Sequence, residues 1–195
     1  MDHYYSKNPM SKSEERTIEY ELNGIRFSFI SDNGVFSKNH VDFATDLLLN
    51  AIAKEKVQGA LLDVGCGYGV IGISLTKIFN TKTTMLDVNE RALDLARKNA
   101  IKNGIDKIEI IESNGFEKIK EKYDVIVTNP PIRAGKEVIY KMYDDAKVHL
   151  NEGGKFYLVI NKKHGAPTTI KHLEELFENI EIIDKKAGFN VIRCS

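Results

Sequence analysis

The chain has 195 residues, of which 42% are hydrophobic and 29% are charged. This length and balance predict one globular domain over residues 1–195, and they exclude a long disordered chain, a collagen-like repeat and a membrane-spanning protein. The 28 basic and 28 acidic side chains cancel, whereas a protein that binds naked nucleic acid tightly by itself usually carries a basic excess.

The polar start of the sequence and its few cysteines limit the compartment and the chemistry. No hydrophobic signal region opens the chain, so we expect a cytoplasmic protein. Cys66 and Cys194 do not form a metal-ligand spacing, and the five histidines are scattered. We therefore expect two reduced thiols and no metal site.

The first predicted element is a β-hairpin within residues 15–35, added in front of a core over residues 41–195. Two strand-like runs, Thr17–Leu22 and Ile25–Ser31, flank the dipeptide Asn23-Gly24, which suits a two-residue turn with positive φ. The next segment, Val41–Ala53, has apolar residues at helical spacing and predicts an amphipathic helix.

From residue 60 onward, strand-like runs alternate with helical stretches. The strand-like runs are Ala60–Val64, Thr83–Asp87, Ile108–Ile111, Tyr123–Thr128 and Phe156–Ile160, and the helical stretches between and after them are 70–78, 90–103, 138–150 and 168–177. This alternation predicts an α/β fold with a parallel sheet and helices on both faces. The last two runs, 180–183 and 189–192, are too close for a helical crossover and should pair antiparallel through residues 185–188.

Ligands of such sheets bind beyond the carboxyl ends of the strands. The first strand end carries Asp63 and then Gly65, Gly67 and Gly69 in the spacing G-x-G-x-G, which differs from the dinucleotide fingerprint G-x-G-x-x-G. An acid before the glycines would repel a pyrophosphate, so the loop suits a ligand whose near end is cationic. A tight turn without a ligand is the alternative.

The next two strand ends carry side chains suited to a nucleoside. Asp87 could accept both ribose hydroxyls, and Asn89 is expected to cap the following helix. Asn114 could contact an adenine edge, although Asn114-Gly115 is also a common turn.

The fourth strand end is the run Asn129-Pro130-Pro131. Two prolines remove backbone donors and stiffen the chain, so the carbonyls of Asn129 and Pro130 should lack local partners and act as acceptors. A rigid turn that only ends the strand is the alternative.

With these motifs the sequence resembles class I S-adenosylmethionine-dependent methyltransferases, and its Asn-Pro-Pro loop resembles that of the branch acting on amino groups. The segment 34–37, the loop 63–69 and the run 129–136 are similar to the single-domain group related to small-subunit ribosomal RNA guanine-N2 methyltransferases. The resemblance implies a Rossmann-like, seven-stranded, mostly parallel sheet with an antiparallel last strand. It also implies S-adenosylmethionine as cofactor and a small N-terminal hairpin beside the cleft.

The resemblance assigns roles to residues of this chain. The catalytic acceptors would be Asn129 and Pro130, drawing the two amine hydrogens so that the nitrogen lone pair faces the methyl group. The residues expected to bind the cofactor are Asp63, Gly65, Cys66, Gly67, Tyr68, Gly69, Asp87, Val88, Asn114, Gly115 and Asn129. Those expected to bind the substrate are Phe36, Pro131, Ile132, Arg133 and Lys136.

Two departures from the family pattern concern the base and the adenine. Ile132 stands where many members carry an aromatic residue that stacks on the base, so another ring must do so. The candidates are Phe36, Phe116, Tyr140 and Tyr143. Asn114 replaces an acid that is often present, which weakens its assignment to the adenine.

The partner is expected to be RNA, in the form of ribosomal RNA within a small-subunit particle, because the neutral charge favours a substrate that offers further contacts. Arg133 and Lys136, with Lys162, Lys163 and His164, should form a local basic lip or a solvated rim. Methylation of a protein glutamine or a small-molecule amine is the alternative activity. A binding module without cofactor and a nicotinamide oxidoreductase are disfavoured by the complete motif set and by the glycine spacing. The sequence does not indicate the oligomeric state.

Overall fold

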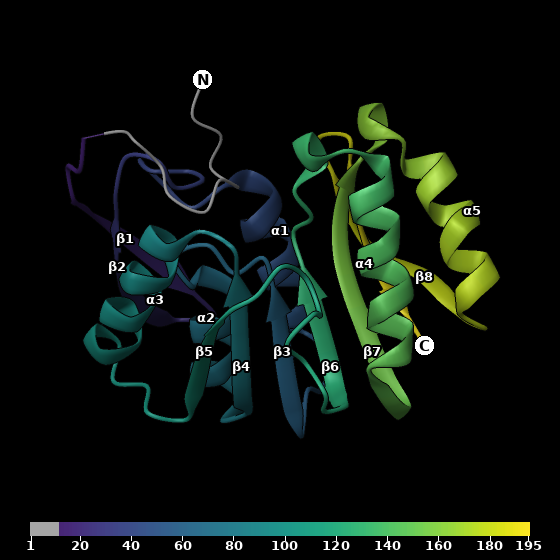
Figure 1. Cartoon of the computed structure of the whole chain (residues 1–195), viewed down its shortest axis with the longest axis horizontal. Coiled ribbons are helices and arrows are strands. Elements are labelled where there is room, and N and C mark those ends of the chain that lie inside the picture. The colour runs from purple at the N-terminus through teal and green to yellow at the C-terminus, as the bar shows by residue number, and fades with distance from the viewer. Residues whose placement is uncertain (1–11) are drawn as a thin grey trace.

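A computed structural model describes residues 12–195, with a two-stranded hairpin beside a seven-stranded sheet (Figure 1). Strands β1 (Arg16–Leu22) and β2 (Ile25–Ser31) pair antiparallel around Asn23 and Gly24, whose φ angles are 52° and 74°. Both angles are positive, as a type I′ turn requires. The predicted hairpin is thus confirmed.

The large sheet has the strand order β5-β4-β3-β6-β7-β9-β8. In chain order its strands are β3 (Ala60–Val64), β4 (Lys82–Asp87), β5 (Ile108–Glu112), β6 (Tyr123–Thr128), β7 (Leu150–Asn161), β8 (Ile180–Lys186) and β9 (Phe189–Cys194). The strands from β5 to β7 are parallel, and β9 runs antiparallel between β7 and β8. The chain order reverses between β3 and β6, which is where open α/β sheets place their ligands.

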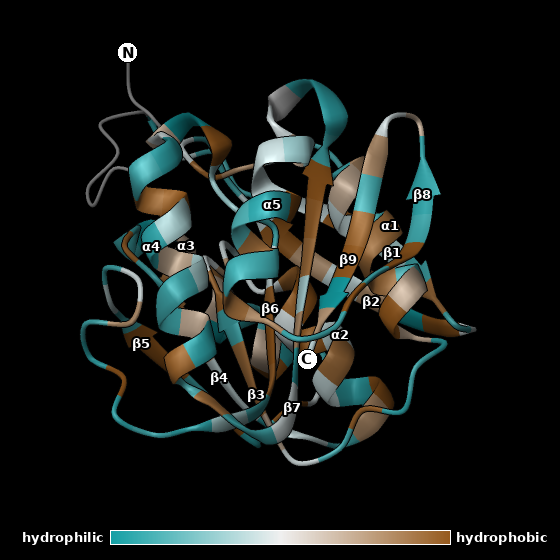
Figure 2. Cartoon of the chain, turned by 90° about the vertical axis from the view of Figure 1, so that its right-hand side faces the viewer, coloured by the Kyte–Doolittle hydropathy of each residue, from teal (hydrophilic) through white to brown (hydrophobic). Residues whose placement is uncertain are grey.

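Helices cover both faces of this sheet. They are α1 (Phe43–Ile52), α2 (Val70–Phe79), α3 (Glu90–Lys102), α4 (Lys136–Val148) and α5 (Ala166–Leu176), with single 3-10 turns η1 (Ile132–Ala134) and η2 (Lys162–His164). Alternate residues of a strand face opposite sides, so Leu61 packs with α1, α2 and α3, whereas Leu62 packs with α4 and α5. Figure 2 shows the central strands as hydrophobic and the outer surfaces of the helices as largely hydrophilic.

The hairpin is attached to the core by the side chains of Asn99 on α3 and of Asn103, the C-cap residue of α3. The Asn99 amide accepts from Ile30 N and donates to Ile30 O, at 2.6 and 2.9 Å, and Asn103 forms the same pair with Ser28 at 3.1 and 3.0 Å. Residues four apart on a helix and two apart on a strand have similar spacing. The two amides therefore replace a neighbouring strand at the edge of β2.

Two predicted boundaries were wrong. Strand β7 begins at Leu150, not near Phe156, because its polar first half pairs with β6 through a register shift after Tyr123. Strand β8 extends to Lys186, so the connecting turn is Ala187-Gly188. The sequence did not reveal these two boundaries because neither segment has an apolar pattern. The first half of β7 pairs with β6 at a bulge, and β8 is an edge strand with exposed side chains.

Within residues 12–195, no helix is long and apolar enough to cross a membrane.

Candidate active site

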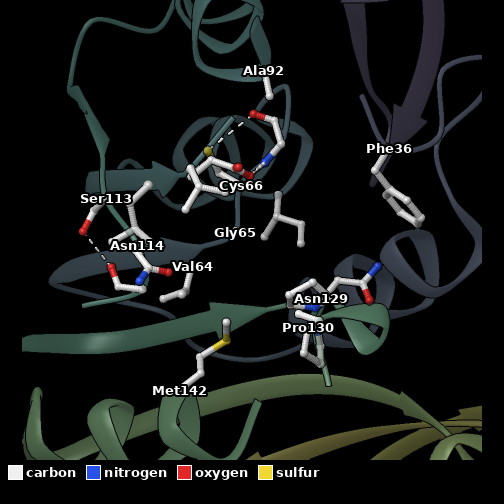
Figure 3. Close-up of a pocket in the computed structure, with 18 of the residues that line it drawn as sticks. Phe36, Val64, Gly65, Cys66, Ala92, Ser113, Asn114, Asn129, Pro130 and Met142 are labelled. Atoms are coloured by element: carbon white, nitrogen blue, oxygen red, sulfur yellow. Dashed lines mark hydrogen bonds between the residues drawn. The ribbon is translucent and has the colours of Figure 1, made fainter. Parts of the chain in front are cut away.

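A cleft of about 700 Å³ opens beyond the carboxyl ends of β3, β4, β5 and β6 (Figure 3). This volume is in the range of sites for small organic ligands. The predicted site residues that line the cleft are Phe36, Gly65, Cys66, Gly67, Tyr68, Asp87, Val88, Asn114, Gly115, Asn129, Pro130 and Pro131. Five strand-end and loop segments that are distant in sequence thus meet at one site.

The loop after β3 presents bare backbone to the cleft. Gly65 and Gly67 have φ angles of 74° and 55°, and a Cβ added to either would meet no atom within 4 Å. The amides of Gly65 and Cys66 both donate to the Leu86 carbonyl at 2.9 Å, which fixes the loop against β4. A Cβ at either glycine would therefore project into the space that a ligand would fill.

Asp63 and Gly69 do not line the cleft but support the loop from behind. Asp63 is fully buried; its Oδ2 accepts from Gly72 N at 2.8 Å, and its Oδ1 has no partner. Burial raises the pKa of this carboxyl to about 7. A Cβ at Gly69 would meet Ile73 Cδ1 at 2.8 Å, so this glycine permits the close packing of α2.

Asp87 stands at the end of β4 and faces the cleft. Its Oδ2 accepts from Gly67 N at 2.8 Å and its Oδ1 from Asn89 N at 2.9 Å. Burial raises its pKa, opposed by these backbone hydrogen bonds. Each carboxylate oxygen keeps a further lone pair, so the group can also accept from two hydroxyls. The predicted capping role belongs to Asn89, whose side chain accepts from Ala92 N at 3.1 Å.

The loop after β5 forms the end of the cleft opposite Phe36 and Asn129, and Figure 3 shows Ser113 and Asn114 there. The Ser113 hydroxyl donates to the Gly115 carbonyl at 2.8 Å and thereby holds the turn. The Asn114 amide nitrogen donates to Glu117 Oε1 at 2.7 Å. Its carbonyl oxygen is thus the part of the side chain left to contact a ligand.

Asn129 is held by two residues that the sequence patterns did not single out. Its Nδ2 donates to Thr45 Oγ1 at 3.0 Å and to Asp42 Oδ2 at 3.3 Å. An ionised carboxylate only accepts hydrogen bonds, so the amide nitrogen must face Asp42 and the Oδ1 atom must point away from it. Asp42 could have been noticed in the sequence as an acid directly before a predicted helix. In the structure it is the N-cap of α1 and accepts from Ala44 N and Thr45 N.

The loop after Asn129 has the predicted free acceptor. Among residues 12–195, no hydrogen bond reaches the Pro130 carbonyl, whereas the Pro131 carbonyl accepts from Ala134 N at 2.8 Å. Ile132, Arg133 and Lys136 lie outside the cleft. Ile132 packs against the core, and the Lys136 ammonium lies 4.8 Å from the centroid of the Tyr140 ring.

Among the rings proposed to contact a base, Phe36 lines the cleft, and it is 40% exposed (Figure 3). The suggestions for Phe116 and Tyr143 were wrong, because both are buried, at 5% and 0% exposure. Phe116 lies in the loop after β5 and packs its ring on His149, and Tyr143 is a buried residue of α4 that packs its ring on Phe156. Tyr140 stacks on His172, with 4.2 Å between ring centroids.

Cys66 is buried against the glycine loop, and its thiol donates to the Gly67 carbonyl at 3.4 Å. Burial, with the neighbouring Asp87 and Asp63, raises the pKa of this thiol well above its usual value. A neutral thiol is a poor nucleophile, so Cys66 fills space beside the cleft. In the part of the chain that the structure describes, no group of three or more His, Cys, Asp or Glu residues could hold a metal ion.

These residues fit S-adenosylmethionine. The bare glycine loop can approach a ligand closely, Asp87 can accept from a ribose, and the loop after β5 can flank an adenine. Together with a sheet whose β9 is inserted antiparallel, they define a methyltransferase of the Rossmann-like class that uses S-adenosylmethionine.

The chain belongs to the methyltransferase small domain family, whose model matches residues 26–193. YbxB of Bacillus subtilis, a protein without an assigned function, is 44% identical over 196 residues, which cover 99% of this chain and 98% of YbxB. Ribosomal RNA small subunit methyltransferase C of Haemophilus influenzae is 32% identical over 194 residues, 97% of this chain and 56% of that protein. The chain thus spans about half the length of these RNA methyltransferases.

The structural comparison agrees with the family. The 16S rRNA N2 methyltransferase RsmC of T. thermophilus, solved with AdoMet and guanosine, matches with a TM-score of 0.84 and 27% identity, over 96% of this chain and 52% of RsmC. The ribosomal protein L11 methylase of Lactobacillus delbrueckii matches with a TM-score of 0.69 and 22% identity, over 83% of this chain and 86% of the other. The second match shows a shared fold only.

Proposed function

We propose that this enzyme methylates an exocyclic amino group of a base, and that its target is guanine N2 in small-subunit ribosomal RNA. The orientation of Asn129 carries the proposal, because the hydrogen bonds to Thr45 and Asp42 direct its Oδ1 away from α1 as an acceptor. The names of the RsmC-type relatives support the choice of substrate.

Methyl transfer to an exocyclic amine requires two hydrogen-bond acceptors beside the amine. An exocyclic amine shares its lone pair with the ring and is a weak nucleophile. The Asn129 Oδ1 and the free Pro130 carbonyl would accept its two hydrogens and leave the lone pair directed at the methyl donor. Positive charge on the nitrogen increases during transfer, so these acceptor dipoles stabilise the transition state more than the ground state.

When bound, S-adenosylmethionine supplies an electrophilic methyl group on a sulfonium. The groups assigned to hold it are the 65–67 backbone, Asp87 and the loop at Asn114. Asp63 and Gly69 are assigned an indirect role, since they brace the glycine loop. Phe36 and Pro131 are assigned to contact the base.

The proposed substrate form is an assembled small-subunit particle. The net charge of the chain is zero, so protein or RNA shape would supply part of the binding energy that a basic excess supplies elsewhere. Ile132, Arg133 and Lys136, outside the cleft, would contact the RNA around the target nucleotide.

The test is transfer of labelled methyl from S-adenosylmethionine to unmodified small ribosomal subunits, followed by nucleoside digestion. We expect N2-methylguanosine, and we expect Asn129→Ala to lower kcat by about 10²- to 10³-fold, as for the loss of one oriented dipole. Asn50→Ala is the matched control, because Asn50 is exposed on α1 and its side chain, within residues 12–195, bonds only to Asp46. Label in a protein glutamine or a small amine, with none in RNA, would refute the proposal.

A further inference from the structure

A pair of aromatic rings, Phe43 and Phe189, lies next to Asp42, one of the two residues that hold Asn129. Neither ring lines the cleft. Phe43, the first residue of α1, follows Asp42 directly and is 39% exposed. Its ring centroid lies 5.6 Å from that of Phe189, at an interplanar angle of 52°. Part of Phe43 is therefore accessible to a ligand, although its ring also packs against Phe189.

Four exposed lysines belong to the two segments next to Phe189, which are the end of β8 and η2. Phe189 begins β9 and is in register with Lys186 on β8 and with Asn161 on β7. The amide of Lys162 donates to the Gly188 carbonyl at 2.8 Å, which places η2 beside the β8–β9 turn. The lysines at these two sites are all exposed; they are Lys162, Lys163, Lys185 and Lys186.

We call these four lysines with Phe43 and Phe189 the β7–β9 rim. The β8–β9 turn and η2 extend beyond the same end of the sheet as η1, as Figures 1 and 2 both show. The rim is thus adjacent to the catalytic loop on the side of Asp42 and extends the basic residues after β7 that the sequence indicated.

The positive charges of the rim are not paired with acidic side chains among the described residues 12–195. In the part of the chain that the structure describes, none of its four lysines forms an ion pair. Cations elsewhere on β7 to β9 do: Lys155 lies 3.8 Å from Glu55, and Arg193 lies 2.6 Å from Glu55 and 2.7 Å from Glu181. Four like charges on η2 and on the adjoining end of β8 repel one another, and an anionic partner relieves this repulsion.

We propose that the β7–β9 rim binds the RNA strand that flanks the target nucleotide, with phosphates on the lysines and a base against Phe43. This inference rests on the proposed function and extends it to a defined surface. Lysine with an exposed ring is the combination that single-stranded nucleic acid uses, because phosphates neutralise the charge and every base has a stacking face. An acidic protein segment would use the lysines and leave the ring without a partner.

Three variants test the rim. In one, Lys162, Lys163, Lys185 and Lys186 are changed to Gln; in another, Phe43→Leu keeps the apolar volume and removes the ring. The matched control is Lys120→Gln with Lys122→Gln, because both lysines are exposed and precede β6, at the amino end of the parallel strands and thus at the opposite end from the rim. The probe is a fluorescent, unmodified transcript of small-subunit ribosomal RNA, and its affinity is measured by anisotropy at several salt concentrations.

We expect the four-lysine variant to bind about 10-fold or more weakly and to have a salt slope smaller by at least about 1, as for lost phosphate contacts. Phe43→Leu should weaken binding by about 5-fold or more with an unchanged slope, because stacking is not ionic. The control should match the wild type. Thermal melting and S-adenosylmethionine affinity of every variant should be unchanged, which excludes misfolding as the cause.

The outcomes separate the two proposals. Wild-type affinity and slope in the rim variants would overturn the rim, whether or not the enzyme methylates RNA. Loss of binding by the rim variants, together with no methyl transfer to RNA by the wild type, would support the rim and refute the proposed function. Rim-dependent binding of polyglutamate that is tighter than binding of the transcript would also overturn the inference.

Discussion

Replacing Thr45 by valine should lower the turnover number by releasing the Asn129 amide. Valine keeps the branched shape of a side chain that is only 7% exposed and removes the Oγ1 that accepts from Asn129 Nδ2 at 3.0 Å. A neutral hydrogen bond contributes about 0.5–1.5 kcal/mol net. If that energy orients the acceptor in the transition state, kcat falls by about 2- to 13-fold.

The assay is methyl transfer to small ribosomal subunits under saturating cofactor, with cofactor affinity measured separately by calorimetry. We expect kcat to fall and the dissociation constant of S-adenosylmethionine to stay the same. Thr76→Val is the matched control, because Thr76 is a buried helical threonine bonded to Gly72 and Thr83, and it does not line the cleft. It should lower the melting temperature without changing kcat.

A double-mutant cycle shows whether Thr45 acts through Asn129. In the Asn129→Ala background the threonine has no amide to orient, so Thr45→Val should have little further effect. The reasoning is refuted if Thr45→Val lowers kcat by the same factor in both backgrounds. It is also refuted if Thr76→Val lowers kcat equally, because general destabilisation would then explain the loss.

Three further changes test the residues that would bind the cofactor and those that support the glycine loop. Asp87→Asn should weaken S-adenosylmethionine binding by about 10- to 100-fold, through loss of charge-assisted hydrogen bonds, and calorimetry should show no such change for the exposed Asp94→Asn. Asn99→Ala should lower the free energy of unfolding by about 2–4 kcal/mol, because it leaves backbone groups of β2 and of the glycine loop without partners; equal loss in Lys102→Ala would contradict this. The Asp63 carboxyl has its pKa raised from 3.8 to about 7, so the folded chain binds more protons between these pH values and stability falls as pH rises. In urea unfolding, the free energy of unfolding of Asp63→Asn relative to that of the wild type should therefore rise by up to about 4 kcal/mol from pH 4 to 7. A difference that does not depend on pH would refute the assigned burial.

Local sequence alone determined much of the framework. The strands Ala60–Val64 and Tyr123–Thr128 were predicted to the residue, because each is a short and mostly apolar run that ends at a glycine or at Asn-Pro-Pro, and such runs are local signals. Asn23-Gly24 specified its turn for the same reason, since only neighbouring residues decide a two-residue connection. The motifs at Gly65, Asp87 and Asn129 were placed at one edge because parallel strands end on the same side.

Tertiary structure decided which groups act on one another across the chain. Asn129 meets Thr45 and Asp42 from 84 and 87 positions away, and no periodic pattern encodes a pairing over that separation. The burial of Phe116 and Tyr143 likewise depends on how the loop after β5 and helix α4 pack in the core, because an aromatic residue in a loop or on a helix suits either a core or a binding surface. Hydrogen-bond partners and exposure are properties of the packed chain, and only its three-dimensional arrangement determines them.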